Sequence, residues 1–224
     1  MSTPITPETA SARTVSDMGR PVADYERIVT ELAYRYDGVF SRESIAQAVQ
    51  DARAHLEPIS KVPDYLPILT ERFARDRLLA AAQSRGLVAT ETPEILFVCV
   101  RNAGRSQMAA ALARHLSGGH VHVRCAGSAP TGEIHPLALE VLRERGIDVS
   151  EAFPKPLTDD VVHAANVIIT MGCGDACPAL PGKRYEDWDV ADPADQPIEV
   201  VRAIADDLQV RVTRLLADLR PTAR

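Results

Sequence analysis

Residues 21–88 carry the helical pattern of apolar and polar positions. Three stretches in this region place apolar side chains three and four positions apart, which is typical of amphipathic helices. Ser41 is a suitable N-cap for the second stretch, and Gly86 ends the third. Three short helices bury only a thin core, so we expect this domain to lean on the rest of the chain or on a second copy. The apolar positions are Tyr25, Ile28, Val29, Leu32, Tyr36, Ile45, Val49, Ala52, Leu56, Leu66, Leu69, Phe73 and Leu78.

From residue 94 onward, short apolar runs alternate with helical stretches. Strands that alternate with helices predict a parallel sheet with right-handed crossovers. We therefore predict an α/β fold for residues 94–224, preceded by a small all-α domain of three helices over 21–88. The expected strands are 95–100, 121–127 and 166–172, and the expected helices are 106–117, 135–146, 158–165 and 197–220.

The loop after the first strand holds the strongest chemical signal. In parallel sheets, ligands bind beyond the carboxyl ends of strands, where a helix begins. Backbone N–H groups of a tight loop and the helix N-terminus attract an anion there. Arg105 offers a planar fork of donors, Gly104 is expected to relieve strain in the turn, and Ser106 can hydrogen-bond the sulfur of Cys99. These features favour a nucleophilic Cys99 thiolate beneath a tetrahedral oxyanion. The loop reads Cys99, Val100, Arg101, Asn102, Ala103, Gly104, Arg105, Ser106.

The spacing Cys-x5-Arg-Ser at a first strand–helix turn resembles the low-molecular-weight tyrosine phosphatase fold. Asp192 and Pro193, late in the chain, stand where that family keeps its general acid. The resemblance covers about residues 94–220 and implies a phosphatase-like parallel sheet with helices on both faces. It implies that residues 100–106 bind the oxyanion and that Asn102 holds a left-handed turn of the loop.

Two positions favour the related arsenate reductases over the phosphatases. Gln107 follows the Arg-Ser pair, where the phosphatases usually have proline and the reductases have glutamine. Ala194 follows Asp-Pro, where the phosphatases typically place an aromatic residue that stacks on phosphotyrosine.

A pair of cysteines gives the third and strongest indication. Cys173 and Cys177 follow the third predicted strand, at the same edge of the sheet as Cys99. A phosphatase needs one thiolate, whereas a reductase that delivers two electrons needs at least two thiols. The resemblance implies that Cys99 attacks arsenate and that Asp192 gives a proton to the departing water. Cys173 then releases arsenite by forming a disulfide with Cys99, and Cys177 moves the disulfide to the Cys173–Cys177 pair, which thioredoxin reduces.

Other interpretations remain open for the same residues. A phosphomonoesterase would use Cys99, Arg105 and Asp192, with Cys173 and Cys177 only protecting the nucleophile from over-oxidation. An arsenate reductase would also work with a small thiol, through a mixed disulfide at Cys99. A non-enzymatic oxyanion or redox sensor is a third class, although the complete catalytic set argues against it. The cysteine pair would also fit an inert core, whereas a zinc site lacks a second Cys/His pair at metal spacing.

Composition narrows the partners and the compartment. The 224-residue chain has a net charge of −6, which argues against nucleic acid as a partner. No run reaches the roughly 20 apolar residues of a membrane span. Residues 1–20 are polar and lack an apolar signal core, so we expect a flexible tail and a cytoplasmic protein with reduced thiols. No metal or organic cofactor is expected.

Some expectations concern single residues and the helical domain. We expect the helical domain to form a homodimer, or alternatively to dock a redox partner. Cys125 is expected to be a small buried residue. Arg101 would be either a solvated side chain or a second handle for the anion, and the sequence does not decide between them. An alkali cation near Asn102 is implied by the resemblance alone.

Overall fold

The computed structural model describes residues 25–89, 92–172 and 178–219, and the expected tail over 1–20 lies outside them. The helical region contains α1 (Tyr25–Arg35), α2 (Arg42–Leu56), the 3-10 helix η2 (Pro63–Tyr65) and α3 (Leu66–Ser84). The three predicted helices are therefore confirmed. Ser41 caps α2 as expected, because its Oγ accepts a hydrogen bond from the Ser44 N–H at 3.2 Å.

A four-stranded parallel sheet forms the centre of the second region. It contains β1 (Glu94–Cys99), β2 (His122–Gly127), β3 (Val167–Met171) and β4 (Arg184–Asp187) in the order β2-β1-β3-β4. The first three strands confirm the prediction. The sequence did not predict β4, because this edge strand is exposed or half-buried throughout and carries no apolar run.

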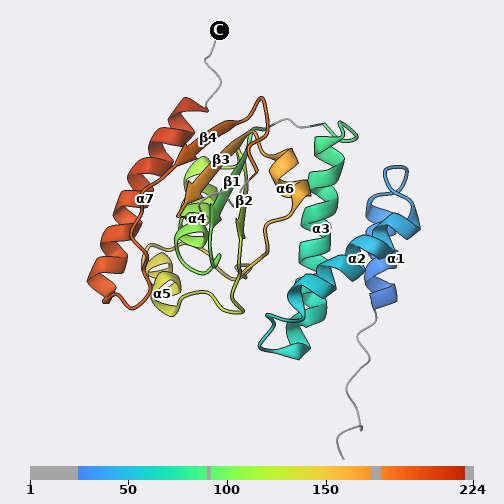
Figure 1. Cartoon of the computed structure of the whole chain (residues 1–224), viewed down its shortest axis with the longest axis horizontal. Helices are drawn as coiled ribbons and strands as arrows, with labels where there is room; N and C mark the ends of the chain where they lie inside the picture. The colour runs from blue at the N-terminus through green and yellow to red at the C-terminus, as the bar shows by residue number, and fades with distance from the viewer. Residues whose placement is uncertain (1–24, 90–91, 173–177, 220–224) are drawn as a thin grey trace, which may run out of the picture.

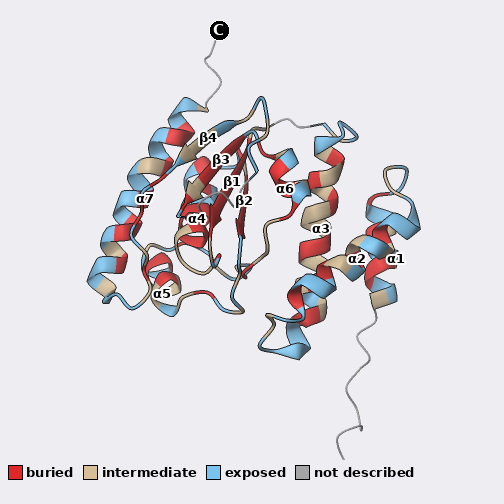
Figure 2. Cartoon of the chain, in the orientation of Figure 1, coloured by how far each residue is buried: buried red, intermediate tan, exposed pale blue. Residues whose placement is uncertain are grey.

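Helices cover both faces of the sheet, as the fold prediction required. One face packs against α4 (Arg105–Ser117), α5 (Pro136–Glu144) and α7 (Ile198–Asp218), and the other against α6 (Asp159–Ala164) and α3 (Figure 1). Side chains of β1 alternate between the two cores: Phe97 and Cys99 face α4 and α7, whereas Leu96 and Val98 face α6. The whole of β1 is therefore buried (Figure 2). No helix in the described ranges combines the length and apolarity that a membrane span needs.

The helical domain packs on the sheet domain of the same chain. Ala80 of α3 belongs to the apolar cluster around Leu96. Phe153 of the sheet domain is buried in the core of the three helices. The thin core predicted for the helical region therefore leans on the rest of the chain, which was one of the two alternatives.

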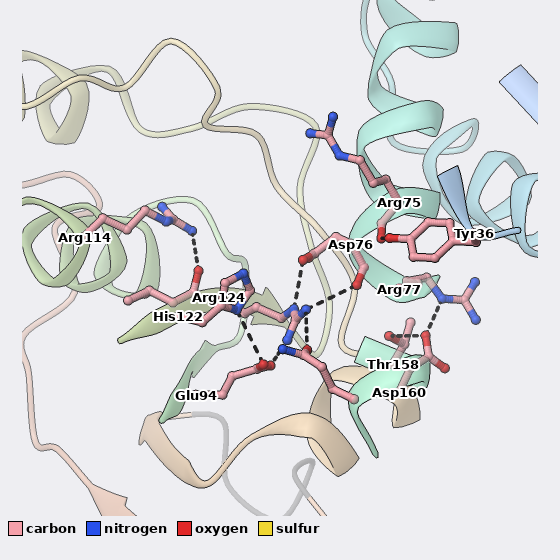
Figure 3. A network of polar contacts seen from close by, with 12 residues as sticks. Tyr36, Arg75, Asp76, Arg77, Glu94, Arg114, His122, Arg124, Thr158 and Asp160 are labelled. Atoms are coloured by element: carbon pink, nitrogen blue, oxygen red, sulfur yellow. Dashed lines mark hydrogen bonds and ion pairs between the residues drawn. The ribbon is translucent and has the colours of Figure 1, made fainter. Parts of the chain in front are cut away.

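Ion pairs cross the same domain contact. Arg124 of β2 lies between Glu94 and Asp76, and its Nε is 2.8 Å from the Oδ1 of Asp76 on α3 (Figure 3). Arg77 of α3 pairs with Asp160 of α6 at 2.6 Å. The side chains of Arg124 and Glu94 are 1% and 0% exposed. This network therefore fixes α3 against the sheet.

Candidate active site

The catalytic loop, residues 99–106, connects the end of β1 to α4. Cys99 is 2% exposed, and its Sγ lies 2.9 Å from the Oγ of Ser106. Asn102 donates from Nδ2 to the same Oγ at 2.8 Å. Because Ser106 accepts from Asn102, its own hydroxyl proton is available to the sulfur. Ser106 and Asn102 thus form a hydrogen-bonded chain that ends on the sulfur of Cys99.

Asn102 holds the loop in its tight shape. Its φ of 48° lies in the left-handed region, which asparagine tolerates better than most residues. The Oδ1 accepts from Gln107 Nε2 at 3.0 Å and from the Lys155 N–H at 2.8 Å. This geometry agrees with the role expected for Asn102. Two donors occupy both lone pairs of Oδ1, so this oxygen does not fit the alkali-cation site that the resemblance implied.

Four carbonyl oxygens of the loop are satisfied by one neighbouring segment, residues 128–135. A bare carbonyl oxygen would repel an oxyanion, and these bonds hold each one on a protein donor instead. The loop can therefore offer an anion donors without opposing acceptors. The pairs are Ser128 N–H with Cys99 O (3.1 Å), Ala129 N–H with Val100 O (2.8 Å), Thr131 N–H with Arg101 O (3.2 Å) and His135 N–H with Ala103 O (2.8 Å).

Two arginines of the loop hold the Asp192 carboxylate. Arg105 Nη2 is 2.9 Å from Oδ2, and Arg101 Nη2 is 3.1 and 3.2 Å from the two oxygens. The Ala194 N–H also donates to Oδ1 at 3.0 Å. Burial by itself raises the pKa of Asp192, but the Ala194 hydrogen bond and the charges of Arg105 and Arg101 outweigh it and leave the pKa below its ordinary value. Arg101 thus faces the site, which supports its interpretation as an anion handle.

Gly104 has a role beyond the turn strain that the sequence suggests. Its φ is −125° and its ψ −91°, and the left-handed position of the loop belongs to Asn102. A Cβ at Gly104 would lie 2.5 Å from the Cγ of Pro193. The glycine therefore allows the segment that carries Asp192 to approach the loop closely.

A cavity of about 210 Å³, which we call the catalytic pocket, is lined by Cys99, Arg101, Gly104, Arg105, Asp192 and Pro193. Sequence analysis missed Lys61, Glu133 and His135, which line it beside Cys99 and Arg105. No local motif marks these residues, because they come from two separate loops. A larger cavity of about 800 Å³ lies between the helical domain and α4, and its lining does not include Cys99.

The predicted resolving cysteines, Cys173 and Cys177, lie outside the described residues. The chain just before them is described: Met171 pairs with Cys99 in the sheet register. Gly172 has a φ of 69°, and a Cβ there would lie 2.7 Å from Nη1 of Arg105. The polypeptide that leads to Cys173 therefore contacts Arg105.

Two further observations concern the remaining cysteine and metals. Cys125 is 2% exposed in the apolar core, which confirms the expectation that it is a small buried residue. Within residues 25–89, 92–172 and 178–219, no group of three or more His, Cys, Asp and Glu side chains is placed to hold a metal ion.

Comparisons with known proteins agree with this geometry. Residues 94–224 match the family model described as low molecular weight phosphotyrosine protein phosphatase, and residues 25–82 match the protein-tyrosine-phosphatase-like N-terminal domain. The structure is similar to that of the Corynebacterium glutamicum thioredoxin-dependent arsenate reductase Cg_ArsC1', with a TM-score of 0.80 and 48% identity over 87% of this chain and 95% of that one.

Two curated proteins are similar to more than half of the chain. A putative arsenate reductase of Halobacterium salinarum is 35% identical over 138 residues, which are 59% of this chain and 97% of the relative. The glutaredoxin arsenate reductase of Synechocystis sp. is 33% identical over 129 residues, 56% of this chain and 98% of the relative.

Proposed function

The chain belongs to the low molecular weight phosphotyrosine protein phosphatase family, and we propose that it reduces arsenate to arsenite with electrons from thioredoxin. One observation carries this proposal beyond the family: the chain that leads into Cys173 contacts Arg105 of the anion loop, through Gly172. In the sequence, Cys173 is the residue directly after Gly172. The similarity to a thioredoxin-dependent arsenate reductase over both domains supports it.

The first step is the attack of Cys99 on arsenic. Arsenate enters the catalytic pocket and takes Arg105 and Arg101 as partners in place of the Asp192 carboxylate, which now pairs with both. Losing these cations raises the proton affinity of Asp192. Asp192 therefore takes up a proton from solvent and donates it to the oxygen that leaves as water. The arsenic–oxygen bond breaks as the Cys99 sulfur forms its bond to arsenic.

The next steps transfer two electrons. The Cys173 thiolate attacks the Cys99 sulfur, and the sulfur–arsenic bond breaks with its electron pair remaining on arsenic. Arsenic(V) becomes arsenic(III), arsenite leaves, and a Cys99–Cys173 disulfide forms. Cys177 then attacks Cys173, which frees Cys99 and leaves a Cys173–Cys177 disulfide for the thioredoxin dithiol to reduce.

The test measures NADPH consumption with arsenate, thioredoxin and thioredoxin reductase. Wild type is expected to turn over, and Cys177→Ser is expected to stall as a Cys99–Cys173 disulfide that peptide mapping identifies. Cys125→Ser is the matched control, because Cys125 is buried opposite Phe97 in the sheet and does not line the catalytic pocket; it should retain turnover. If wild type consumes no NADPH under these conditions, the thioredoxin-coupled relay is wrong.

Two alternatives have their own signatures in the same variants. A phosphomonoesterase built from Cys99, Arg105 and Asp192 would hydrolyse an aryl phosphate at a rate that survives Cys173→Ser and Cys177→Ser together. A reductase that uses a small thiol would reduce arsenate with glutaredoxin and glutathione or a similar thiol, and Cys177→Ser would then remain active. The match to a glutaredoxin arsenate reductase makes this second comparison necessary.

The proposal extends to assembly and compartment. We propose a homodimer formed through the helical domain, where Tyr34 is 89% and Tyr65 60% exposed. Light scattering on the purified protein, with Tyr34→Ser as the variant expected to weaken association, tests this. A mechanism that cycles free thiols also favours the reducing cytoplasm as its compartment.

A further inference from the structure

The helical domain contributes a charged side chain to the catalytic pocket. Lys61 lies in the loop between α2 and η2, and it lines the same 210 Å³ cavity as Cys99, Arg105 and Asp192. The loop belongs to the N-terminal domain, whereas every other residue around this pocket comes from the sheet domain. The pocket is thus incomplete without the helical domain.

Close contacts fix this loop at the mouth of the pocket. A Cβ at Gly132 would lie 2.0 Å from the Ile59 carbonyl oxygen, so the two backbones touch. Lys61 Nζ lies 2.8 Å from Oε2 of Glu133. The segment that carries Gly132 and Glu133 is itself bonded to the catalytic loop through the Thr131 N–H. A single intervening segment, residues 131–133, therefore connects Lys61 to the catalytic loop.

The other end of the helical domain is anchored independently. Arg124 joins β2 to Asp76 of α3, and Arg77 of α3 joins Asp160 of α6 (Figure 3). Because α3 follows η2 directly, this network limits how far the loop of Lys61 can move relative to the pocket. The position of Lys61 is a consequence of how the two domains are joined.

The ion pairs around the pocket can all be exchanged. Lys61 and Glu133 are 60% and 63% exposed, and an exposed pair of this kind contributes about 0–1 kcal/mol. Without an anion, Glu133 pairs with Lys61, and Asp192 pairs with Arg101 and Arg105. Two carboxylates of the protein thus pair with Lys61, Arg101 and Arg105, and a doubly charged oxyanion can displace these carboxylates.

We infer that Lys61 is an oxyanion-binding residue supplied by the helical domain. When an oxyanion binds on the loop of Cys99, the Lys61 ammonium leaves Glu133 and pairs with an outward-facing oxygen of the anion. Glu133 competes with the anion for the Lys61 ammonium and therefore weakens the binding of the anion. This arrangement selects small, multiply charged oxyanions such as phosphate and arsenate. The part that concerns arsenate rests on the proposed function, whereas the binding of the oxyanion does not.

The experiment measures how well inorganic phosphate protects Cys99 from iodoacetamide. Trypsin releases residues 86–101 as a peptide whose only cysteine is Cys99, so alkylation there is read by mass spectrometry without interference from the other thiols. We expect Lys61→Met to raise the phosphate concentration for half-protection about tenfold, which corresponds to one charge-assisted contact. Glu133→Gln should lower it by about two- to threefold, and Lys61→Arg should stay near wild type.

A matched control separates local binding from net charge. Arg53→Met removes one cation from the same domain and the same kind of surface pair, because Arg53 lies 3.0 Å from Glu57 away from the pocket. It should leave protection unchanged. The rate ratio of anionic iodoacetate to neutral iodoacetamide at Cys99 should fall in Lys61→Met and not in Arg53→Met.

Activity then distinguishes this inference from the proposed function. With arsenate, Lys61→Met should raise KM about tenfold at nearly constant kcat, which is the signature of lost substrate binding. If phosphate protection is equal in wild type and Lys61→Met, the inference is wrong, whatever the activity shows. If protection changes as expected but no variant reduces arsenate, the inference stands and the proposed function fails.

Discussion

Arginine–carboxylate pairs occur at two places in this molecule, and they differ in burial. At the domain contact, Arg124 and Glu94 are 1% and 0% exposed. Arg124 also bonds Asp76 (Figure 3) and Gln83. At the catalytic pocket, Arg105 is 13% exposed but its partner Asp192 is 41% exposed. Solvent therefore reaches the carboxylate of Asp192 far more than it reaches the Arg124–Glu94 pair.

Burial decides what each set of charges can do. Charges removed from water must keep their partners, because separating a buried pair costs several kcal/mol. The Arg124 network is therefore a fixed joint between two domains. A partly exposed carboxylate can leave its arginines at little cost, since water solvates it. Asp192 can thus hold the place of an oxyanion and give it up when one arrives.

Burial and neighbouring charges also shift the pKa values of Asp76 and His122 at the domain contact. At the joint, burial would raise the pKa of Asp76, but the charges of Arg124 and Lys155 and the hydrogen bond from Arg124 lower it overall. His122, beside Glu94, has a lowered pKa because burial disfavours its charged form and Arg114 adds repulsion. The joint therefore stays ionised at Asp76 without requiring a charged His122.

The largest expected effect separates the two sets by stability. Arg124→Met leaves the buried carboxylate of Glu94 without its cation, so the free energy of unfolding should fall by about 3–5 kcal/mol. Arg105→Met should lower the free energy of unfolding by less than about 1 kcal/mol, because water can solvate the Asp192 carboxylate. The same variant should lower arsenate turnover by about 10²- to 10³-fold. Urea denaturation and steady-state kinetics measure the two quantities.

Arg124→Lys provides a second variant in case Arg124→Met does not fold. It keeps the charge but loses the planar guanidinium that contacts Glu94 and Asp76 together. Its stability should therefore lie between those of wild type and Arg124→Met. Equal stability of Arg124→Met and wild type would contradict the idea that this network joins the domains.

A smaller effect is expected where the catalytic loop meets the segment of Asp192. Gly104→Ala would place a Cβ 2.5 Å from Pro193 Cγ, which should cost about 1–3 kcal/mol of stability and displace Asp192. We expect kcat to fall about ten- to a hundredfold. Adding Pro193→Ala removes the atom in conflict, so the double variant should recover part of both losses. Strictly additive losses would show that the contact is not the cause.

The sequence predicted what depends on neighbours along the chain. Helical periodicity located the three N-terminal helices, and the apolar run before Cys99 located the central strand. The anion loop was also readable, because Cys99, Asn102, Arg105 and Ser106 lie within eight consecutive residues. Local spacing fixes such a loop once a strand precedes it and a helix follows it.

What the sequence did not predict depends on distant partners. Gly104 is also required by Pro193, which is far away in the chain, and a local explanation by turn strain does not contain this contact. Lys61 reaches the pocket only because the two domains are joined. Arg124, inside an expected apolar strand, has its carboxylate partners on α3 and at the start of β1. No pattern of single residues contains this information.

The smallest expected effect is the pH dependence of the exchangeable pair. The pKa of Asp192 is lowered in the folded protein, so its pairing stabilises the protein above the unfolded pKa of about 3.9 and is lost as pH falls through the lowered value. At pH 7 the free energy of unfolding of wild type should exceed that of Asp192→Asn by less than about 1 kcal/mol, because the carboxylate is partly exposed. The difference should vanish in strong acid.

Phosphate provides the sharper form of this last test. A bound oxyanion takes the arginine partners of Asp192, so saturating phosphate should shrink the stability difference between wild type and Asp192→Asn at pH 7. Asp206→Asn is the control, because Asp206 pairs with Arg145 at 2.7 Å on the surface, and its effect should not respond to phosphate. If phosphate does not change the stability difference between wild type and Asp192→Asn, the carboxylate does not occupy the place of the anion. The two sets of arginine–carboxylate pairs would then be alike in function.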